Sequence, residues 1–100
     1  MSIYREVAEA EANAEPVALC ILTSSSGSTP RHAGSKMLVY MGGRTRGTIG
    51  GGEVESRVIQ EALTALVDGK SRRLSYNMVD PQKGDPGICG GQVEVFVEPV

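Results

Sequence analysis

The chain has 100 residues, ten basic and twelve acidic side chains, and a formal net charge of −2, which is the size of one small domain with a single core. No apolar run approaches the roughly eighteen residues of a membrane span, and the first residues lack the pattern of a secretory signal. The two cysteines lack metal-ligand spacing, so neither a zinc site nor a disulfide framework is indicated, and we expect a cytoplasmic protein.

The first half of the chain predicts a helix, a strand and a hairpin. Ser2 caps a short helix whose apolar residues recur at near-helical spacing until Pro16 ends it. Residues 17–23 form a continuous apolar run, which is typical of a central strand covered on both faces. Two further extended segments, 36–40 and 44–49, predict a hairpin because glycine-containing turn residues separate them.

The second half of the chain predicts one long helix and two strands. An apolar stripe extends over about residues 53–68, from the triple glycine to Asp68-Gly69. Segments 73–78 and 93–97 alternate apolar and polar side chains, as half-buried strands do. Together these elements predict a single α/β or α+β domain with a mixed sheet of about five strands, the long helix and a shorter N-terminal helix. The chain has no tryptophan and one phenylalanine, so its core is small and aliphatic. Such a core favours a homo-oligomer or a missing partner domain.

Charge is unevenly distributed along the chain. The segment 16–52 holds no aspartate or glutamate, and it carries four cationic side chains, Arg31, Lys36, Arg44 and Arg46. This pattern favours a local anion site, and a solvated basic hairpin is the alternative. Only one aromatic residue, Tyr40, is interleaved with these cations, so a nucleic-acid partner is disfavoured.

A triple glycine leads from an extended segment into the long helix. Gly50, Gly51 and Gly52 would expose N–H groups at the helix start, and such groups attract anions. The spacing fits neither of the familiar phosphate-binding glycine motifs, and Glu53 and Glu55 would compete with a bound anion in the first turn. Close packing of the strand against the helix is the alternative reason for these glycines.

The apolar strand continues into residues 24–31, which are rich in hydroxyl groups. Four serines and a threonine offer hydrogen bonds there, and Arg31 follows a proline that restricts the local backbone. Ligands bind beyond strand ends in open α/β sheets, so this segment is a candidate ligand site. A purely structural turn is the alternative.

One cysteine lies in a second glycine-rich loop. Cys89 is flanked by glycines in sequence, so we expect a poorly shielded thiol that can bind a soft metal or carry sulfur. The alternative is that Cys89 is only a small residue in a tight turn. Cys20 belongs to the apolar strand and is predicted to lie in the core. His32 is the only histidine, and no nucleophile can be assigned to it, so a catalytic pair of nucleophile and base is not indicated.

Four motifs follow one another along the chain. They are Ser-Gly-Ser-Thr-Pro-Arg at 26–31, Gly-Ser-Lys-Met-Leu-Val at 34–39, Gly-Thr-Ile-Gly-Gly-Gly-Glu-Val-Glu at 47–55, and Gly-Ile-Cys-Gly-Gly at 87–91, which continues into a strand. Together they resemble the N-terminal domain of the XdhC/CoxI family, the xanthine dehydrogenase accessory proteins.

The resemblance implies a maturation factor that binds the molybdenum cofactor (molybdopterin), supports its sulfuration with a cysteine desulfurase, and delivers it to a xanthine dehydrogenase-type molybdoenzyme. The cofactor-binding residues that it implies are Ser26, Gly27, Ser28, Thr29, Arg31, Gly50, Gly51, Gly52, Cys89, Gly90 and Gly91. Full-length members of the family continue into a Rossmann-like domain that this chain lacks. We therefore expect either a stand-alone version or a partner chain that supplies that domain.

Two other functions stay open. A thiol-dependent enzyme would use Cys89 as a nucleophile or sulfur carrier, and it would need a reactive thiolate. A non-catalytic oligomerisation or interaction module would use the loops to shape an interface, and it would not bind molybdopterin.

Overall fold

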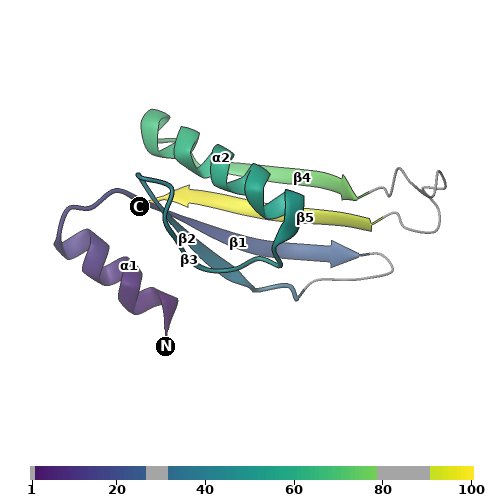
Figure 1. The fold of residues 1–100 in the computed structure, drawn as a ribbon, viewed down its shortest axis with the longest axis horizontal. Helices are drawn as coiled ribbons and strands as arrows, with labels where there is room; N and C mark the ends of the chain where they lie inside the picture. Colours follow the sequence, from purple (N-terminus) through teal and green to yellow (C-terminus); the bar gives the residue numbers. More distant parts are fainter. Residues whose placement is uncertain (1, 27–31, 79–90) are drawn as a thin grey trace.

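The computed structural model describes residues 2–26, 32–78 and 91–100, and it shows one sheet with a helix on each face (Figure 1). The elements in chain order are α1 (Ile3–Ala12), β1 (Val17–Ser26), β2 (Lys36–Tyr40), β3 (Thr45–Gly47), α2 (Gly52–Asp68), β4 (Arg72–Met78) and β5 (Gly91–Pro99). The strand order is β3-β2-β1-β5-β4, and each of these pairings is antiparallel.

This architecture confirms the predicted α+β domain with five strands, one long helix and a shorter N-terminal helix. One detail of the prediction was wrong, because the described sheet is antiparallel rather than mixed. A parallel pair of neighbours needs a crossover of about a dozen or more residues. The long connection that contains α2 leads from β3 at one edge to β4 at the other edge, so it does not join two neighbouring strands.

The central strand β1 is covered from both sides, as its continuous apolar run predicts. Ala18, Cys20 and Leu22 belong to the larger core, which lies beneath α2. Val17 and Leu19 alternate with them and belong to a smaller cluster beneath α1. The predictions of a central strand and of a core position for Cys20 are both confirmed.

Each helix covers the sheet with its apolar stripe. The hydroxyl of Ser2 accepts a hydrogen bond from the N–H of Tyr4 at 3.2 Å and caps α1. The buried side chains of α2 are Val54, Val58, Ala62 and Ala65, and the helix ends at Gly69, whose φ is +73°. Burial of one aliphatic side chain stabilises the fold by roughly 1.5–3 kcal/mol, so packing rather than helix propensity holds α2. Within the described residues, no helix is both long and apolar enough to cross a membrane.

We predict that Gly47→Ala destabilises the protein more than Gly43→Ala does. Both glycines have a positive φ, +76° and +93°, which costs an alanine about 1–2 kcal/mol. A methyl group at Gly47 would also lie 2.5 Å from the carbonyl oxygen of Lys36, whereas one at Gly43 would meet no atom within 4 Å. Urea unfolding measures the difference, which we expect to be at least about 1 kcal/mol. Equal losses would contradict the close approach of β3 to β2 at Gly47.

Candidate functional site

Two of the three predicted site segments join the sheet at neighbouring strands. β1 ends at Ser26 and β5 begins at Gly91, and Ser26 pairs with Gln92 in the register of the two strands. The end of β1, from which the hydroxyl-rich segment continues, therefore lies next to the start of β5, which follows the segment that bears Cys89. Both lie at one end of the sheet (Figure 1). Residues 48–51, here called the glycine loop, connect β3 to α2. The start of α2 is directed toward the same end of the sheet.

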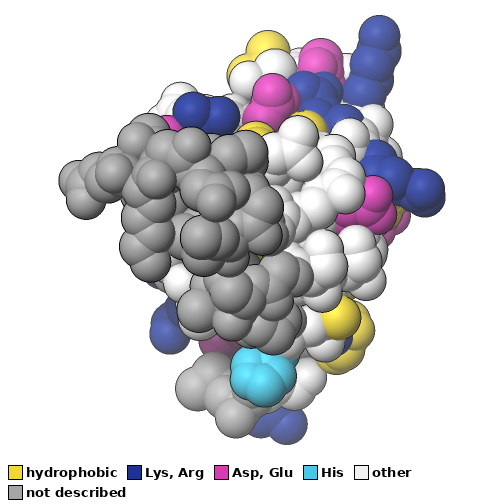
Figure 2. Space-filling view, turned by 90° about the vertical axis from the view of Figure 1, so that its right-hand side faces the viewer, with side chains coloured by type: hydrophobic (Ala, Val, Ile, Leu, Met, Phe, Trp, Pro, Cys, Tyr) yellow, Lys and Arg dark blue, Asp and Glu magenta, His cyan; other side chains and the backbone are white. Residues whose placement is uncertain are grey.

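The predicted site is described only in part. The site residues outside the described ranges are Gly27, Ser28, Thr29, Arg31, Cys89 and Gly90. The site residues inside them are Ser26, Gly50, Gly51, Gly52 and Gly91. Seen from this end (Figure 2), the described surface is mainly backbone and neutral polar side chains, and lysine and arginine side chains lie around its margin.

A β-bulge interrupts β1 where the strand changes from apolar to polar residues. The register with β5 shifts between Leu22 and Ser24, which leaves Thr23 as the extra residue. The hydroxyl of Thr23 donates to the carbonyl oxygen of Glu94 at 3.1 Å, and the hydroxyl of Ser24 donates to the Glu94 carboxylate at 3.2 Å. These two bonds attach the bulge to β5.

The bulge decides which serines face which side of the sheet. Ser25 pairs with Val93, which lies in the core beneath α2, and Ser26 pairs with Gln92. Side chains of directly paired residues project from the same face, so Ser25 lies on the α2 face and Ser26 on the opposite face. Ser25 is half-buried and was not among the predicted site residues. No signal in the sequence could have found it, because a run of serines hides the change in alternation.

The glycine loop is held by a carboxylate from the first turn of α2. Glu55 Oε1 accepts hydrogen bonds from the N–H of Ile49 at 3.2 Å and from the N–H of Gly51 at 3.0 Å, and also from the hydroxyl of Thr48. The same hydroxyl accepts from the N–H of Gly50 at 3.0 Å. Glu55 therefore places a carboxylate of the chain itself on N–H groups just before α2, and its competition with a bound anion stays a prediction.

Gly51 leaves the main chain of this loop open. It has φ +76° and ψ −168° and stands as the N-cap of α2. A methyl group built at Gly51 would meet no atom within 4 Å. Close packing of strand against helix therefore does not explain this glycine, whereas its positive φ does. The result is a loop that a ligand can approach along its backbone.

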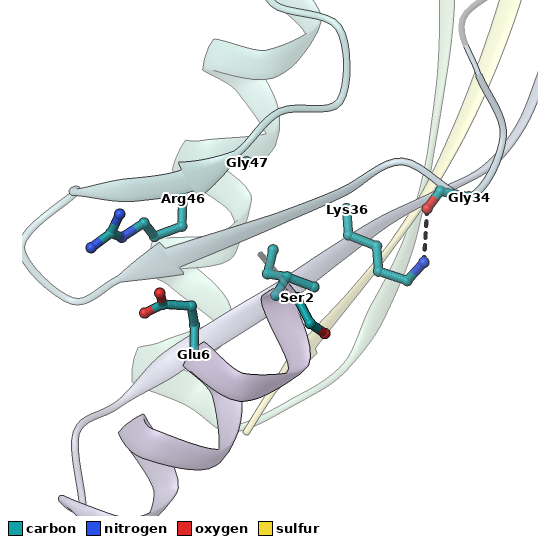
Figure 3. A pocket seen from close by; sticks show the side chains of 7 residues that line it. Ser2, Glu6, Gly34, Lys36, Arg46 and Gly47 are labelled. Carbon is teal, nitrogen blue, oxygen red and sulfur yellow. Dashed lines mark hydrogen bonds between the residues drawn. The ribbon is translucent and has the colours of Figure 1, made fainter.

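The basic side chains of the hairpin lie on the other side of the sheet, next to α1. Lys36 and Arg46 border a pocket of about 410 Å³ together with Ser2 and Glu6 at the start of α1 (Figure 3). Lys36 Nζ donates to the carbonyl oxygen of Gly34 at 2.9 Å. These two cations are therefore separated by the sheet from the glycine loop and α2.

Arg44 is also engaged near α1. Its guanidinium lies 4.0 Å from the centre of the Tyr40 ring and 3.6 Å from the Glu15 carboxylate. Such exposed contacts stabilise weakly. For the described cations, the geometry thus favours the solvated basic hairpin over the local anion site.

Cys20 is a core residue, and His32 is an exposed residue next to the undescribed segment 27–31. Burial raises the pKa of the Cys20 thiol to about 12, so the thiol stays protonated at neutral pH. The His32 side chain is exposed, and its carbonyl oxygen accepts from the Ser35 hydroxyl at 2.7 Å. Among the described residues, no group of three or more histidine, cysteine, aspartate or glutamate side chains could hold a metal ion.

A sequence model of the XdhC and CoxI family matches residues 10–77. The chain belongs to the XdhC and CoxI family. The match spans the central strand, the hairpin, the glycine loop, α2 and most of β4. The family resemblance predicted from the four motifs is thereby confirmed.

Two proteins that this chain resembles are much longer than the chain itself. The uncharacterized protein YqeB of Escherichia coli (strain K12) is 43% identical over 101 aligned positions, which cover 97% of this chain and 18% of YqeB. A crystal structure described as a xanthine dehydrogenase from Bacillus halodurans matches with a TM-score of 0.76 and 22% identity, over 100% of this chain and 31% of that chain. At that identity the likeness shows a shared fold. The chain thus spans less than a fifth of the curated relative and about a third of the solved structure.

Glu55→Ala is expected to lower the free energy of unfolding by about 1–3 kcal/mol, because it removes the acceptor that binds the N–H groups of Ile49 and Gly51. Glu53→Ala is the matched control in the same helical turn. The Glu53 side chain is 78% exposed in an ion pair with Arg57, so its loss should change stability by less than about 0.5 kcal/mol. Urea unfolding compares the two variants, and equal effects would refute the bracing role of Glu55.

The buried thiol predicts a labelling result. Wild type and Cys20→Ser should incorporate the same amount of iodoacetamide at pH 8 in the native state, because the pKa of Cys20, about 12, leaves almost no thiolate. In urea the wild type should take up additional label at Cys20. Mass spectrometry of the alkylated chains measures both quantities. Native labelling of Cys20 would show that β1 opens readily.

Proposed function

We propose that the chain is an accessory factor that binds the molybdenum cofactor and assists its sulfuration and its insertion into a xanthine dehydrogenase-type molybdoenzyme. Membership of the XdhC and CoxI family supports this proposal, and the solved structure from Bacillus halodurans carries the name of such an enzyme. The end of the sheet beside the glycine loop is the candidate site.

The observation that carries the proposal is the pairing of Ser26 with Gln92, the residue after Gly91. This pairing joins the hydroxyl-rich segment and the segment of Cys89 to adjacent strands, so we expect one ligand to contact groups from both segments. Molybdopterin carries a phosphate, a flat polar ring system and sulfur ligands to its metal. Hydroxyl groups, the Arg31 guanidinium and a thiol are the groups that suit those features.

The described loop fits a ligand that approaches the main chain. No atom lies within 4 Å of a methyl group built at Gly51, so a ligand can approach the main chain there. Glu55 already accepts from the N–H groups of the loop, so we expect the phosphate to bind Arg31 and the neighbouring hydroxyls instead of the helix start. When bound, the cofactor would supply a sulfur-ligated molybdenum centre, and Cys89 is the thiol expected near the metal or its sulfur.

The partners in this proposal follow from the same family. A cysteine desulfurase would supply the sulfur, and the apo-molybdoenzyme would receive the cofactor. Delivery would also use a Rossmann-like domain, supplied in cis or by a separate chain. The relatives matched by this chain are several times longer, which leaves room for such a domain in them.

The proposal predicts that Gly51→Ala weakens cofactor binding and that Gly69→Ala does not. The two glycines begin and end α2 with φ of +76° and +73°, and a methyl group at either would meet no atom within 4 Å. Their strain is therefore matched, and only Gly51→Ala puts a methyl group into the proposed site. Equilibrium dialysis against molybdenum cofactor should show at least about tenfold weaker binding, or about 1.4 kcal/mol.

Cys89→Ala provides a second arm of the same titration. We expect it to weaken binding, whereas Cys20→Ala should lower stability and leave binding unchanged, because Cys20 lies in the core. A wild type that binds no cofactor, or equal weakening by Gly51→Ala and Gly69→Ala, would refute the proposed site.

A further inference from the structure

Among the described strands, β4 forms a long edge of the sheet. The strand order ends with β3 on one side and β4 on the other (Figure 1). β3 has three residues and β4 has seven, and β4 contains neither proline nor glycine. An edge strand presents N–H and C=O groups that another strand can pair with, and proteins protect such edges by shortening them or by adding proline. β3 is shortened in this way, and β4 is not.

A groove runs beside β4 where α2 does not cover the sheet completely. Its volume is about 390 Å³, and it is lined by Arg57, Gln60, Glu61, Thr64 and Tyr76; we call it the β4 groove. Leu74 and Tyr76 of β4 are only partly buried against the core. The edge thus offers backbone groups together with an incompletely covered apolar strip.

The charges of the β4 groove are self-complementary. Arg57 and Glu61 have opposite charges and stand one helical turn apart on α2. A two-fold axis reverses the direction of the second helix, so it sets Arg57 of one copy toward Glu61 of the other, and the reverse. Glu53, the own-chain partner of Arg57 at 2.9 Å, is 78% exposed, whereas Arg72, the own-chain partner of Glu61 at 3.4 Å, is only 20% exposed. The Arg57 and Glu61 side chains are themselves 62% and 41% exposed, so both stay accessible at the groove.

We propose that β4 pairs antiparallel with β4 of a second copy of this chain, about a two-fold axis at Ser75, and so joins two sheets into one. Ser75 is the central residue of Arg72–Met78, so this register pairs the whole strand. It sets Leu74 opposite the partner's Tyr76 on the α2 face, and Arg73 opposite the partner's Asn77 on the other face. Apolar and aromatic residues meet, and no two arginines are opposed.

A second copy suits this edge better than an unrelated peptide. Each feature of the edge complements itself when it is rotated by a two-fold axis: the Leu74–Tyr76 strip about Ser75, and the pair of opposite charges in the β4 groove. An isologous interface requires this property, whereas an unrelated strand would need only the backbone groups. The inference does not depend on cofactor binding, and its tests contain no cofactor.

Cysteine crosslinking tests the register. In a Cys89→Ser background, Ser75→Cys should form a covalent dimer under mild oxidation or with a short bis-maleimide, because the two Cα atoms would lie about 5 Å apart. Arg73→Cys is the matched control on the same exposed face. Its two copies would lie about 14 Å apart along the strands, which is too far for a disulfide. Equal crosslinking of the two variants would overturn the register.

A substitution in the β4 groove tests the interface itself. Sedimentation equilibrium of the wild type should give twice the chain mass of 10.5 kDa. Thr64→Arg adds two positive charges near the axis and should raise the dimer dissociation constant at least about tenfold. Ser56→Arg, an exposed position of α2 outside the groove, should leave it unchanged. A monomeric wild type, or a dimer that Thr64→Arg does not weaken, would overturn the proposal.

Discussion

Burial of the first part of β1 from both faces is the constraint on which the other elements depend. A strand with apolar side chains on both sides needs cover above and below, and α2 and α1 provide it. The remaining strands extend the sheet on either side of β1. Beyond Leu22 the side chains of the strand are polar and are exposed or half-buried, so the candidate site is proposed where the apolar part of β1 ends.

Most of the fold could be predicted because its signals are local. α1 and α2 each show apolar residues at helical spacing, which predicts a helix with one buried face. β1 shows a continuous apolar run, which predicts a strand covered on both faces. The antiparallel pairing was missed because the sequence does not say which edge α2 leads to. Likewise, the bulge at Thr23 adds one residue within a polar run, and it exchanges the faces of Ser25 and Ser26 without any change in composition.

The candidate site shows what a glycine motif leaves undetermined. The sequence predicted a helix start that attracts anions and a nearby glutamate that competes for it. In the structure Glu55 accepts hydrogen bonds from the N–H groups of Ile49 and Gly51. This contact depends on the distance between the loop and the first turn of α2, and the spacing of the glycines along the sequence does not determine that distance. The loop is therefore a backbone held in shape by its own chain, and its open side is at Gly51.

The bulge also makes this end of β1 tolerant of a change in chain length. Ser24 and Ser26 present hydroxyl groups on one face of the sheet and Ser25 presents one on the other, as their partners Glu94, Gln92 and Val93 in β5 require. Because Thr23 is the extra residue of the register, removing it would restore regular pairing and leave these three serines opposite the same residues, with the apolar pairing before Leu22 in place. Homologous chains can therefore gain or lose this one residue without redirecting their polar groups and without altering the core.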